Sequence, residues 1–139
     1  MATLIDTSLW LAMYRDRTGA LAKVVRDASG PHEPQFARFV AMEILQGCSS
    51  EPEWNLVEDH LRDQRYIEVS ARTWHDAARI YFDLRNIGVT VRSSIDCCIA
   101  QLTIESDLTL LHNDRDFEKI AQVRPLKHLR IDVEKVTKP

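Results

Sequence analysis

Acidic residues stand at several places in this sequence where their side chains can gather into one site. Asp6 ends one short apolar run, and Asp114 and Asp116 follow another, while Asp96 and Glu43 lie on stretches with helical spacing. Carboxylates that share one pocket repel one another, and a hard cation removes that repulsion. A site made only of oxygen ligands suits Mg²⁺ or Mn²⁺ better than zinc. Such an ion activates water and stabilises a phosphoryl transition state.

Four of these acids also have ordinary structural explanations. Taken alone, Asp6 is better explained as a helix cap or a turn residue, a common role for aspartate. Asp96 lies in the first turn of a predicted helix, where an acid interacts favourably with the helix dipole. Asp114 and Asp116 can form an Asx turn that caps the helix beginning near Phe117.

Glu43 is harder to explain as a surface residue. Helical spacing from Phe36 and Phe39 places Glu43 on the apolar face of its helix. An ionised carboxylate left there without a partner costs several kcal/mol, roughly. Glu43 therefore needs a cation or a hydrogen-bond donor, and the equal alternative is an edge position from which the acid reaches water.

Alternating strands and helices are predicted along the chain. Strands are expected over 2–6, at the start of 35–47, and over 66–70, 107–112 and 128–136, and helices over 7–16, 19–30, the rest of 35–47, 51–63, 71–88, 93–106 and 115–123. This order predicts an α/β protein, a sandwich around a mainly parallel sheet. Ligand sites in such sheets lie at the carboxyl ends of the strands, where several of the acids fall.

Within the predicted elements, three faces can be assigned from spacing. The helix over 71–88 is expected to present Trp74, Ala77, Ala78 and Tyr81 on one side, and the helix over 51–63 to present Trp54, Val57 and Leu61. The alternation of Leu129, Ile131 and Val133 predicts the final strand.

Composition and charge exclude several classes of protein. The 139 residues are 45% hydrophobic and 28% charged, which predicts one globular domain over 1–139. No apolar run approaches the ~20 residues that span a bilayer, and the N-terminus lacks a signal peptide's basic region, so a cytoplasmic protein is expected. The three cysteines include no CxxC pair, which argues against a zinc site or a disulfide framework. Motifs for serine hydrolases, zinc proteases and P-loop enzymes are absent.

The acids lie in segments that resemble the PIN-domain nucleases, and within them the VapC-type toxins of bacterial toxin–antitoxin pairs. The matching segments are "LIDTSLWLA" (4–12), "AMEILQG" (41–47) and "SSIDCCIAQLTIESDLTLLHNDRDFEKIA" (93–121). They occur in the family's order and spacing, and they span nearly the whole chain. Asp-Thr-Ser after a first strand is a weak motif alone, whereas the ordered set is fairly specific.

The resemblance implies a three-layer α/β/α sandwich and a Mg²⁺-dependent endoribonuclease, with Mn²⁺ as a possible substitute. It places metal ligands or catalytic acids at Asp6, Glu43, Asp96 and the pair Asp114 and Asp116. Asp6 and Asp96 match the family's most constant ligands. A hydroxyl from Thr7 or Ser8 would orient a ligand or a water, and Asn113 would be an auxiliary group.

The sequence departs from the family at His112, where threonine is common before the last acidic motif. Either Asp114 or Asp116 can then supply the fourth carboxylate. We expect Asp114 to face the metal pocket and Asp116 to cap the Phe117 helix or hold a water. The number of metal ions, one or two, stays open.

An RNA substrate needs a positive surface, although the net charge is −3. The candidates for contacts with RNA are Arg15, Arg17, Arg85 and Arg92, with Lys23, Arg26 and Arg79 nearby in the sequence. For any single one, a solvated helix face is the better explanation. The resemblance also implies a homodimer, a cognate antitoxin whose tail inhibits the site, and a tRNA or rRNA substrate.

Two other functions are compatible with part of this pattern. A receiver-type phosphoacceptor domain also gathers acids around Mg²⁺ at strand ends. This chain, however, lacks paired acids after its first strand and a clear lysine after its last. A PIN fold that only binds RNA or protein is the second alternative, and the intact set of acids argues against it.

Overall fold

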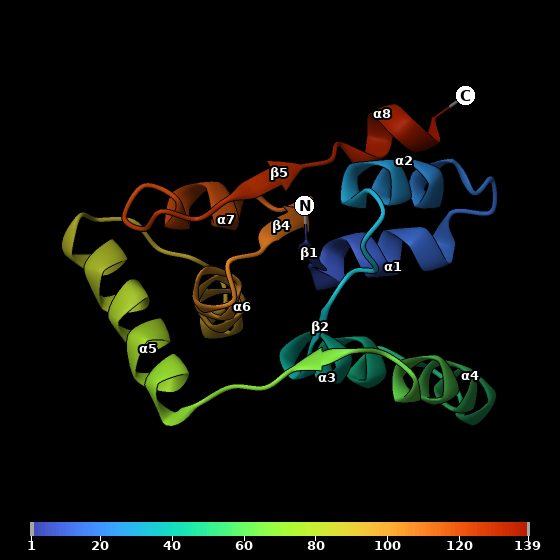
Figure 1. Ribbon diagram of the computed structural model, residues 1–139, viewed down its shortest axis with the longest axis horizontal. Helices are drawn as coiled ribbons and strands as arrows, with labels where there is room; N and C mark the ends of the chain where they lie inside the picture. Colours follow the sequence, from blue (N-terminus) through green and yellow to red (C-terminus); the bar gives the residue numbers. More distant parts are fainter. Residues whose placement is uncertain (1, 139) are drawn as a thin grey trace.

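A parallel sheet of short strands forms the centre of the protein, described for residues 2–138 by a computed structural model (Figure 1). Strands β1 (Thr3–Ile5), β4 (Thr109–His112) and β5 (His128–Arg130) pair in the order β1-β4-β5, and every pair is parallel. Strands β2 (Phe36–Ala37) and β3 (Tyr66–Ile67) form a second parallel pair, which a bridge from Gln35 to Leu4 joins to β1. All carboxyl ends therefore point the same way.

The helices cover both faces of this sheet. Their bounds are α1 Thr7–Arg15, α2 Ala20–Ser29, α3 Arg38–Gln46, α4 Glu51–Arg62, α5 Ala71–Asn86, α6 Ser94–Glu105, α7 Arg115–Ile120 and α8 Val133–Thr137. Helices α5 and α6 pack against each other, and the C-terminal α8 packs on α2 at the opposite side of the molecule (Figure 1).

Two hydrophobic cores lie on the two faces of the sheet, because successive side chains of a strand point in opposite directions. Leu4 and Leu110 belong to the larger core, which contains residues of α3, α5, α6 and α7. Their neighbours Ile5 and Leu111 belong to the smaller core with residues of α1 and α2. The three-layer α/β/α sandwich with a parallel sheet is thus confirmed. Among residues 2–138, no helix combines the length and hydropathy needed to cross a membrane.

Most predicted elements are present, but the predicted faces of two helices are partly wrong. On α5 the buried residues are Thr73, Ala77, Ile80 and Leu84, whereas Trp74 is 53% exposed. Trp74 instead lies at the edge of the helix, where its ring meets Phe39 at 87°. On α4 only Leu61 is buried.

The predicted final strand is also partly wrong. Only His128–Arg130 is strand, and Leu129 is 45% exposed at this edge of the sheet. Asp132 then accepts a hydrogen bond from the backbone of Lys135 and begins α8, a helix that the alternating pattern does not predict.

Candidate metal centre

The ends of β1 and β4 bring the acidic segments together. Asp6 follows β1 directly, and its backbone N–H donates to the carbonyl of Leu111 in β4 at 2.9 Å. Asp114 follows β4 by two residues and begins α7. The parallel pairing of two adjacent strands therefore places both segments at one edge of the sheet, as the rule for such folds predicts.

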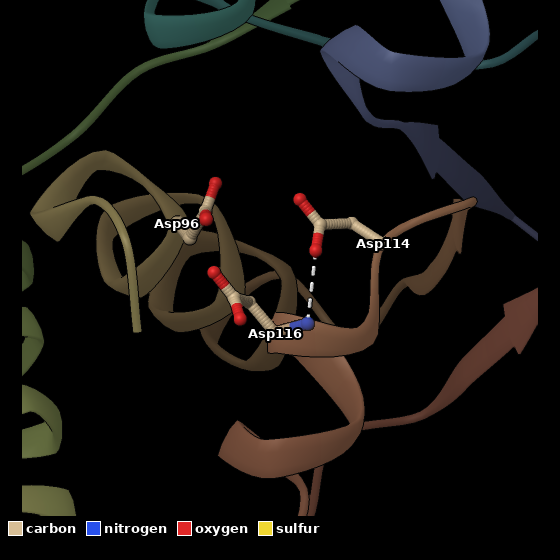
Figure 2. A group of neighbouring side chains, drawn as sticks. All are labelled: Asp96, Asp114 and Asp116. Carbon is tan, nitrogen blue, oxygen red and sulfur yellow. Dashed lines mark hydrogen bonds between the residues drawn. The ribbon is translucent and has the colours of Figure 1, made fainter. Parts of the chain in front are cut away.

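Asp96, Asp114 and Asp116 form the most compact acidic group (Figure 2). One carboxylate oxygen from each lies within 4.8 Å of the others. Asp96 is 8% exposed and Asp116 is 3% exposed, so water screens their charges poorly. Three oxygens this close are a suitable donor set for a hard divalent cation.

Asp96 is the acid in the least favourable surroundings. Burial raises its pKa to about 8, and the nearby charges of Asp6, Asp114 and Glu43 act in the same direction. Within residues 2–138, no hydrogen bond or ion pair reaches its carboxylate. A buried acid without a donor, surrounded by other acids, is a group that a cation would stabilise.

Asp6 lies beside this group and is held by Ser8. The Asp6 carboxylate accepts hydrogen bonds from the Ser8 backbone at 3.0 Å and from the Ser8 hydroxyl at 2.6 Å. Burial raises the pKa of Asp6, although these bonds oppose the rise. Asp6 is thus the N-cap of α1 and also a neighbour of the acidic group, so its structural role does not exclude a functional one.

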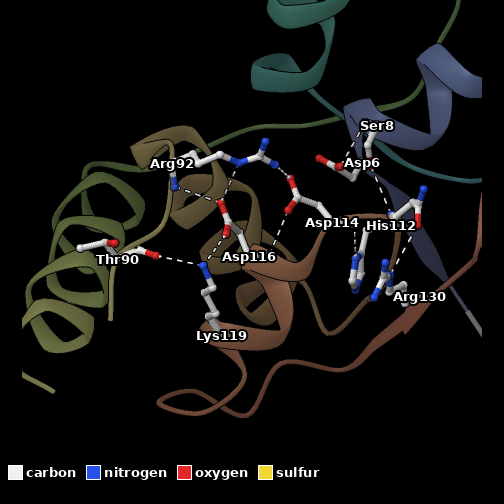
Figure 3. A network of polar contacts seen from close by, with 10 residues as sticks. Asp6, Ser8, Thr90, Arg92, His112, Asp114, Asp116, Lys119 and Arg130 are labelled. Carbon is white, nitrogen blue, oxygen red and sulfur yellow. Dashed lines mark hydrogen bonds and ion pairs between the residues drawn. The ribbon is translucent and has the colours of Figure 1, made fainter. Parts of the chain in front are cut away.

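Ser8 joins the two strand ends. Its hydroxyl oxygen also accepts a hydrogen bond from the backbone N–H of Asn113 at 3.2 Å (Figure 3). The Asn113 side chain lies toward Arg130, whose Nε is 3.4 Å from Asn113 Oδ1. Of the two hydroxyls predicted to orient a ligand, that of Ser8 therefore donates to Asp6 and accepts from the loop after β4.

Thr7, the second hydroxyl, serves Glu43. Its Oγ1 donates to Glu43 Oε1 at 2.7 Å and joins the start of α1 to α3. Glu43 is half-buried. Its exposure lies between the two alternatives expected from its helical spacing, a position on the apolar face and an edge position that reaches water. The donor that this carboxylate requires is present.

The prediction that separates the roles of Asp114 and Asp116 is wrong about the cap. Asp114 is the N-cap of α7, and its Oδ1 accepts a hydrogen bond from the backbone N–H of Asp116 at 2.9 Å (Figure 2). Asp116 is the second residue of α7, and its carboxylate lies in the acidic group. In an Asx turn the aspartate side chain accepts a hydrogen bond from the backbone N–H two residues later in the chain. The first aspartate of the pair, Asp114, is therefore the one that caps the helix.

Two cations hold Asp116. Arg92 reaches it through its backbone N–H at 2.9 Å and its Nε at 3.5 Å, and Lys119 Nζ lies 3.2 Å away. Burial raises the pKa of Asp116, but the Arg92 and Lys119 contacts outweigh it and bring the pKa below its usual range. The pKa of Asp116 is therefore shifted downward, whereas that of Asp96 is shifted upward.

His112 is a structural residue that the sequence pattern alone does not assign. It is fully buried, and burial lowers its pKa to about 4. Its Nδ1 accepts the Asp114 backbone N–H at 3.1 Å, so the proton of the neutral ring lies on Nε2, which donates to His128 Nδ1 at 2.9 Å. His112 thus fixes the loop that bears Asp114.

The predicted RNA-binding arginines are scattered over the molecule. Arg15 and Arg17 are exposed at the end of α1 opposite Asp6, and Arg85 is exposed in the last turn of α5. Only Arg92 lies at the acidic group, where its guanidinium pairs with aspartates.

Known proteins resemble this chain over nearly its full length. The PIN domain family model matches residues 3–123. The VapC ribonuclease Mb1587 of Mycobacterium bovis is 36% identical over 128 residues, which cover 89% of this chain and 95% of that protein. Ribonuclease VapC11 of Mycobacterium tuberculosis shows the same identity and coverage.

Solved structures share the fold at lower identity. VapBC2 from Rickettsia felis, bound to a DNA fragment from its promoter, superposes with a TM-score of 0.78 at 15% identity, covering 95% of this chain and 100% of that one. VapBC-5 from Mycobacterium tuberculosis, described as a member of a toxin–antitoxin family, gives 0.67 at 16% identity, with coverage of 94% and 98%. This fold, the identity to VapC ribonucleases and the acidic group at the strand ends agree, and the chain belongs to the PIN-domain family, among the VapC ribonuclease toxins.

Proposed function

We propose that this chain is a Mg²⁺-dependent endoribonuclease that hydrolyses RNA phosphodiester bonds as the toxin of a toxin–antitoxin pair. The observation that carries the proposal is Asp96, a buried acid that receives no donor within residues 2–138 and lies beside four other carboxylates. This arrangement is unfavourable unless a cation occupies it. The ribonuclease names of the relatives at 36% identity support the same activity.

The residues divide into ligands and groups that orient them. Asp6, Asp96 and Asp114 would hold the ion, with Glu43 and Asp116 completing the acidic shell directly or through water. When bound, a divalent cation supplies Lewis-acid activation of water and neutralises charge that develops on the phosphate. Mg²⁺ is the ion proposed, because it prefers oxygen ligands and carboxylates, and Mn²⁺ can replace it.

The polar neighbours fix the direction of these acids. Ser8 holds Asp6 by its hydroxyl and its backbone N–H. Thr7 donates to Oε1 of Glu43 and so fixes the direction of this carboxylate. Ordering of ligands by such hydrogen bonds is the usual function of the outer contacts in metal sites.

The proposed partners follow from the family and from the VapBC proteins that share the fold. The substrate is RNA, either tRNA or rRNA, and the protein acts on it in the cytoplasm. A cognate antitoxin inhibits the toxin, and VapBC-5 of Mycobacterium tuberculosis, which shares the fold, belongs to a family of toxin–antitoxin systems. The active form is a homodimer of the single domain 1–139, in which Arg15, Arg17 and Arg85 contact RNA. Steep salt dependence of RNA binding tests these basic contacts.

Cleavage of a total tRNA and rRNA pool by antitoxin-free protein tests the proposed activity. The parent is compared with Asp6→Asn and Asp96→Asn, with and without EDTA, and with Asp27→Asn as a control in an exposed acid of α2. Cleavage by the parent and the control, abolished by EDTA and by both site substitutions, is expected. A folded parent that binds Mn²⁺ and cleaves no RNA would favour the binding module instead.

A further inference from the structure

Arg92 connects two of the acids through one guanidinium (Figure 3). Its Nη2 lies 2.8 Å from Asp114 Oδ2, and its Nε lies 3.5 Å from Asp116 Oδ2. Arg92 belongs to the loop between α5 and α6, four residues before Asp96. A single side chain therefore spans the two aspartates at the start of α7.

The loop that carries Arg92 is itself fixed to α7. The Arg92 backbone N–H donates to Asp116 at 2.9 Å, and Lys119 Nζ reaches the Thr90 carbonyl at 3.3 Å as well as Asp116. Val91, between them, is 5% exposed and packs in the larger core. The backbone that carries Arg92 is thus fixed to α7, and the side chain extends from it to the two aspartates.

The two aspartates depend on Arg92 to different degrees. Asp116 keeps Lys119 and the backbone N–H of residue 92 whatever the side chain there. Within the described chain, Asp114 receives donors from two places only: the Asp116 backbone on Oδ1 and Arg92 on Oδ2. Without Arg92, Asp114 Oδ2 loses its partner and the carboxylate is repelled by its acidic neighbours.

The charge of Arg92 has two opposite effects on a cation at this site. It repels the cation, and it also orients the ligands. The Arg92 side chain is 79% exposed, so water screens the repulsion strongly. Hydrogen bonding to the carboxylate is a short-range effect that survives this screening, and a carboxylate oxygen has a second lone pair for the metal. The gain in cation affinity from oriented ligands should therefore exceed the loss caused by the positive charge of Arg92.

We infer that Arg92 is a positioning residue of the metal centre, which holds Asp114 and Asp116 turned toward Asp96. This role rests on the proposed metal site and differs from the contact with RNA that the sequence suggests for Arg92. Arg92 does not touch the reacting atoms in this role. It keeps the ligand Asp114 and the neighbouring acid Asp116 in the orientation that ion binding requires.

Mn²⁺ binding without RNA, followed by electron paramagnetic resonance of the free ion, tests this role. Arg92→Gln should weaken Mn²⁺ binding about 10-fold or more, the usual effect of removing an outer contact from a metal site. Arg92→Lys retains the charge but not the two-point bridge, so its binding should remain below that of the parent. Arg72→Gln is the matched control, because Arg72 is 77% exposed and pairs with Asp76 at 3.1 Å on α5.

The same variants separate positioning from other roles. If Arg92 positions ligands, excess Mn²⁺ restores kcat of Arg92→Gln while KM for RNA stays at the parent's value. A raised KM with unchanged Mn²⁺ affinity would show that Arg92 contacts RNA and would overturn the inference, as would tighter Mn²⁺ binding. In EDTA, Arg92→Gln should unfold at the same temperature as Arg72→Gln. A large loss of stability in Arg92→Gln alone would also overturn the inference. A parent that binds no Mn²⁺ would instead remove the proposed function, and this inference with it.

Discussion

Replacing Asp96 by asparagine should stabilise the metal-free protein at neutral and alkaline pH. The Asp96 carboxyl has a pKa of about 8 in the fold, against 3.8 for an ordinary aspartate. Because the folded-state pKa is the higher one, its stabilising contribution is complete below pH 3.8 and is lost as the pH rises toward 8. The metal-free protein therefore becomes less stable over this interval, whereas the neutral amide of the Asp96→Asn variant does not ionise.

The size of this effect follows from proton linkage. At pH 7 the unfolded chain carries an ionised Asp96 and the fold a protonated one, which costs about 4 kcal/mol at ~1.36 kcal/mol per pH unit. This is an upper bound, because water and neighbouring acids rearrange around the charged form. About 2 kcal/mol is expected, and for a domain of this size that raises Tm by roughly 5 °C or more.

Thermal unfolding at pH 5 and pH 8 in EDTA measures the effect. The difference in Tm between Asp96→Asn and the parent should be larger at pH 8 than at pH 5, because the cost of ionising Asp96 grows with pH. The effect of exchanging a carboxyl for an amide, apart from ionisation, is the same at both pH values. Asp27→Asn on α2 is the control and should show no such pH dependence. Excess Mn²⁺ should raise the Tm of the parent and leave that of Asp96→Asn nearly unchanged. An equal difference at the two pH values would refute the electrostatic argument for this site.

Three further outcomes are expected. Ser8→Ala removes the hydroxyl that joins Asp6 to the Asn113 backbone, so Mn²⁺ affinity should fall about 10-fold in a titration of the metal-free protein. Phe117→Ala empties a fully buried site under His112, and urea unfolding should show a loss of about 3–5 kcal/mol. His112→Asn removes a ring whose pKa is about 4, so the stability lost by the parent as the pH falls from 6.5 to 4 should be reduced in acid titrations followed by circular dichroism.

The sequence pattern locates the acids well because their positions follow from local rules. Asp6 and Asp114 occur where buried strands end, and the parallel order of the strands brings those ends together. The partner that Glu43 requires also follows from its helical spacing, although the donor, Thr7, is 36 residues away. These inferences need only periodicity and the direction of the strands.

The remaining features depend on loop conformation and on the edges of the sheet. The contact of Arg92 with Asp114 is set by the path of the chain before α6, and the pattern suggests RNA binding for Arg92 instead. Leu129 alternates correctly for a strand, yet β5 is the last strand of the sheet and leaves this residue 45% exposed. Trp74 is large enough to lie at a helix edge and contact Phe39 from there.

The hydrogen bond from the Asp6 amide to Leu111 has a consequence for the lifetime of the site. This bond continues the β1–β4 ladder by one residue, so the amide of a proposed ligand belongs to the centre of the sheet. Amides in a packed parallel ladder are among the slowest in a domain to exchange with solvent, so the Asp6 amide should be strongly protected in hydrogen exchange. The backbone of Asp6 is then as persistent as the pairing of β1 with β4. Asp114 and Asp116 lie after β4, at the start of α7, so hydrogen exchange should show whether their end of the site opens more readily than Asp6.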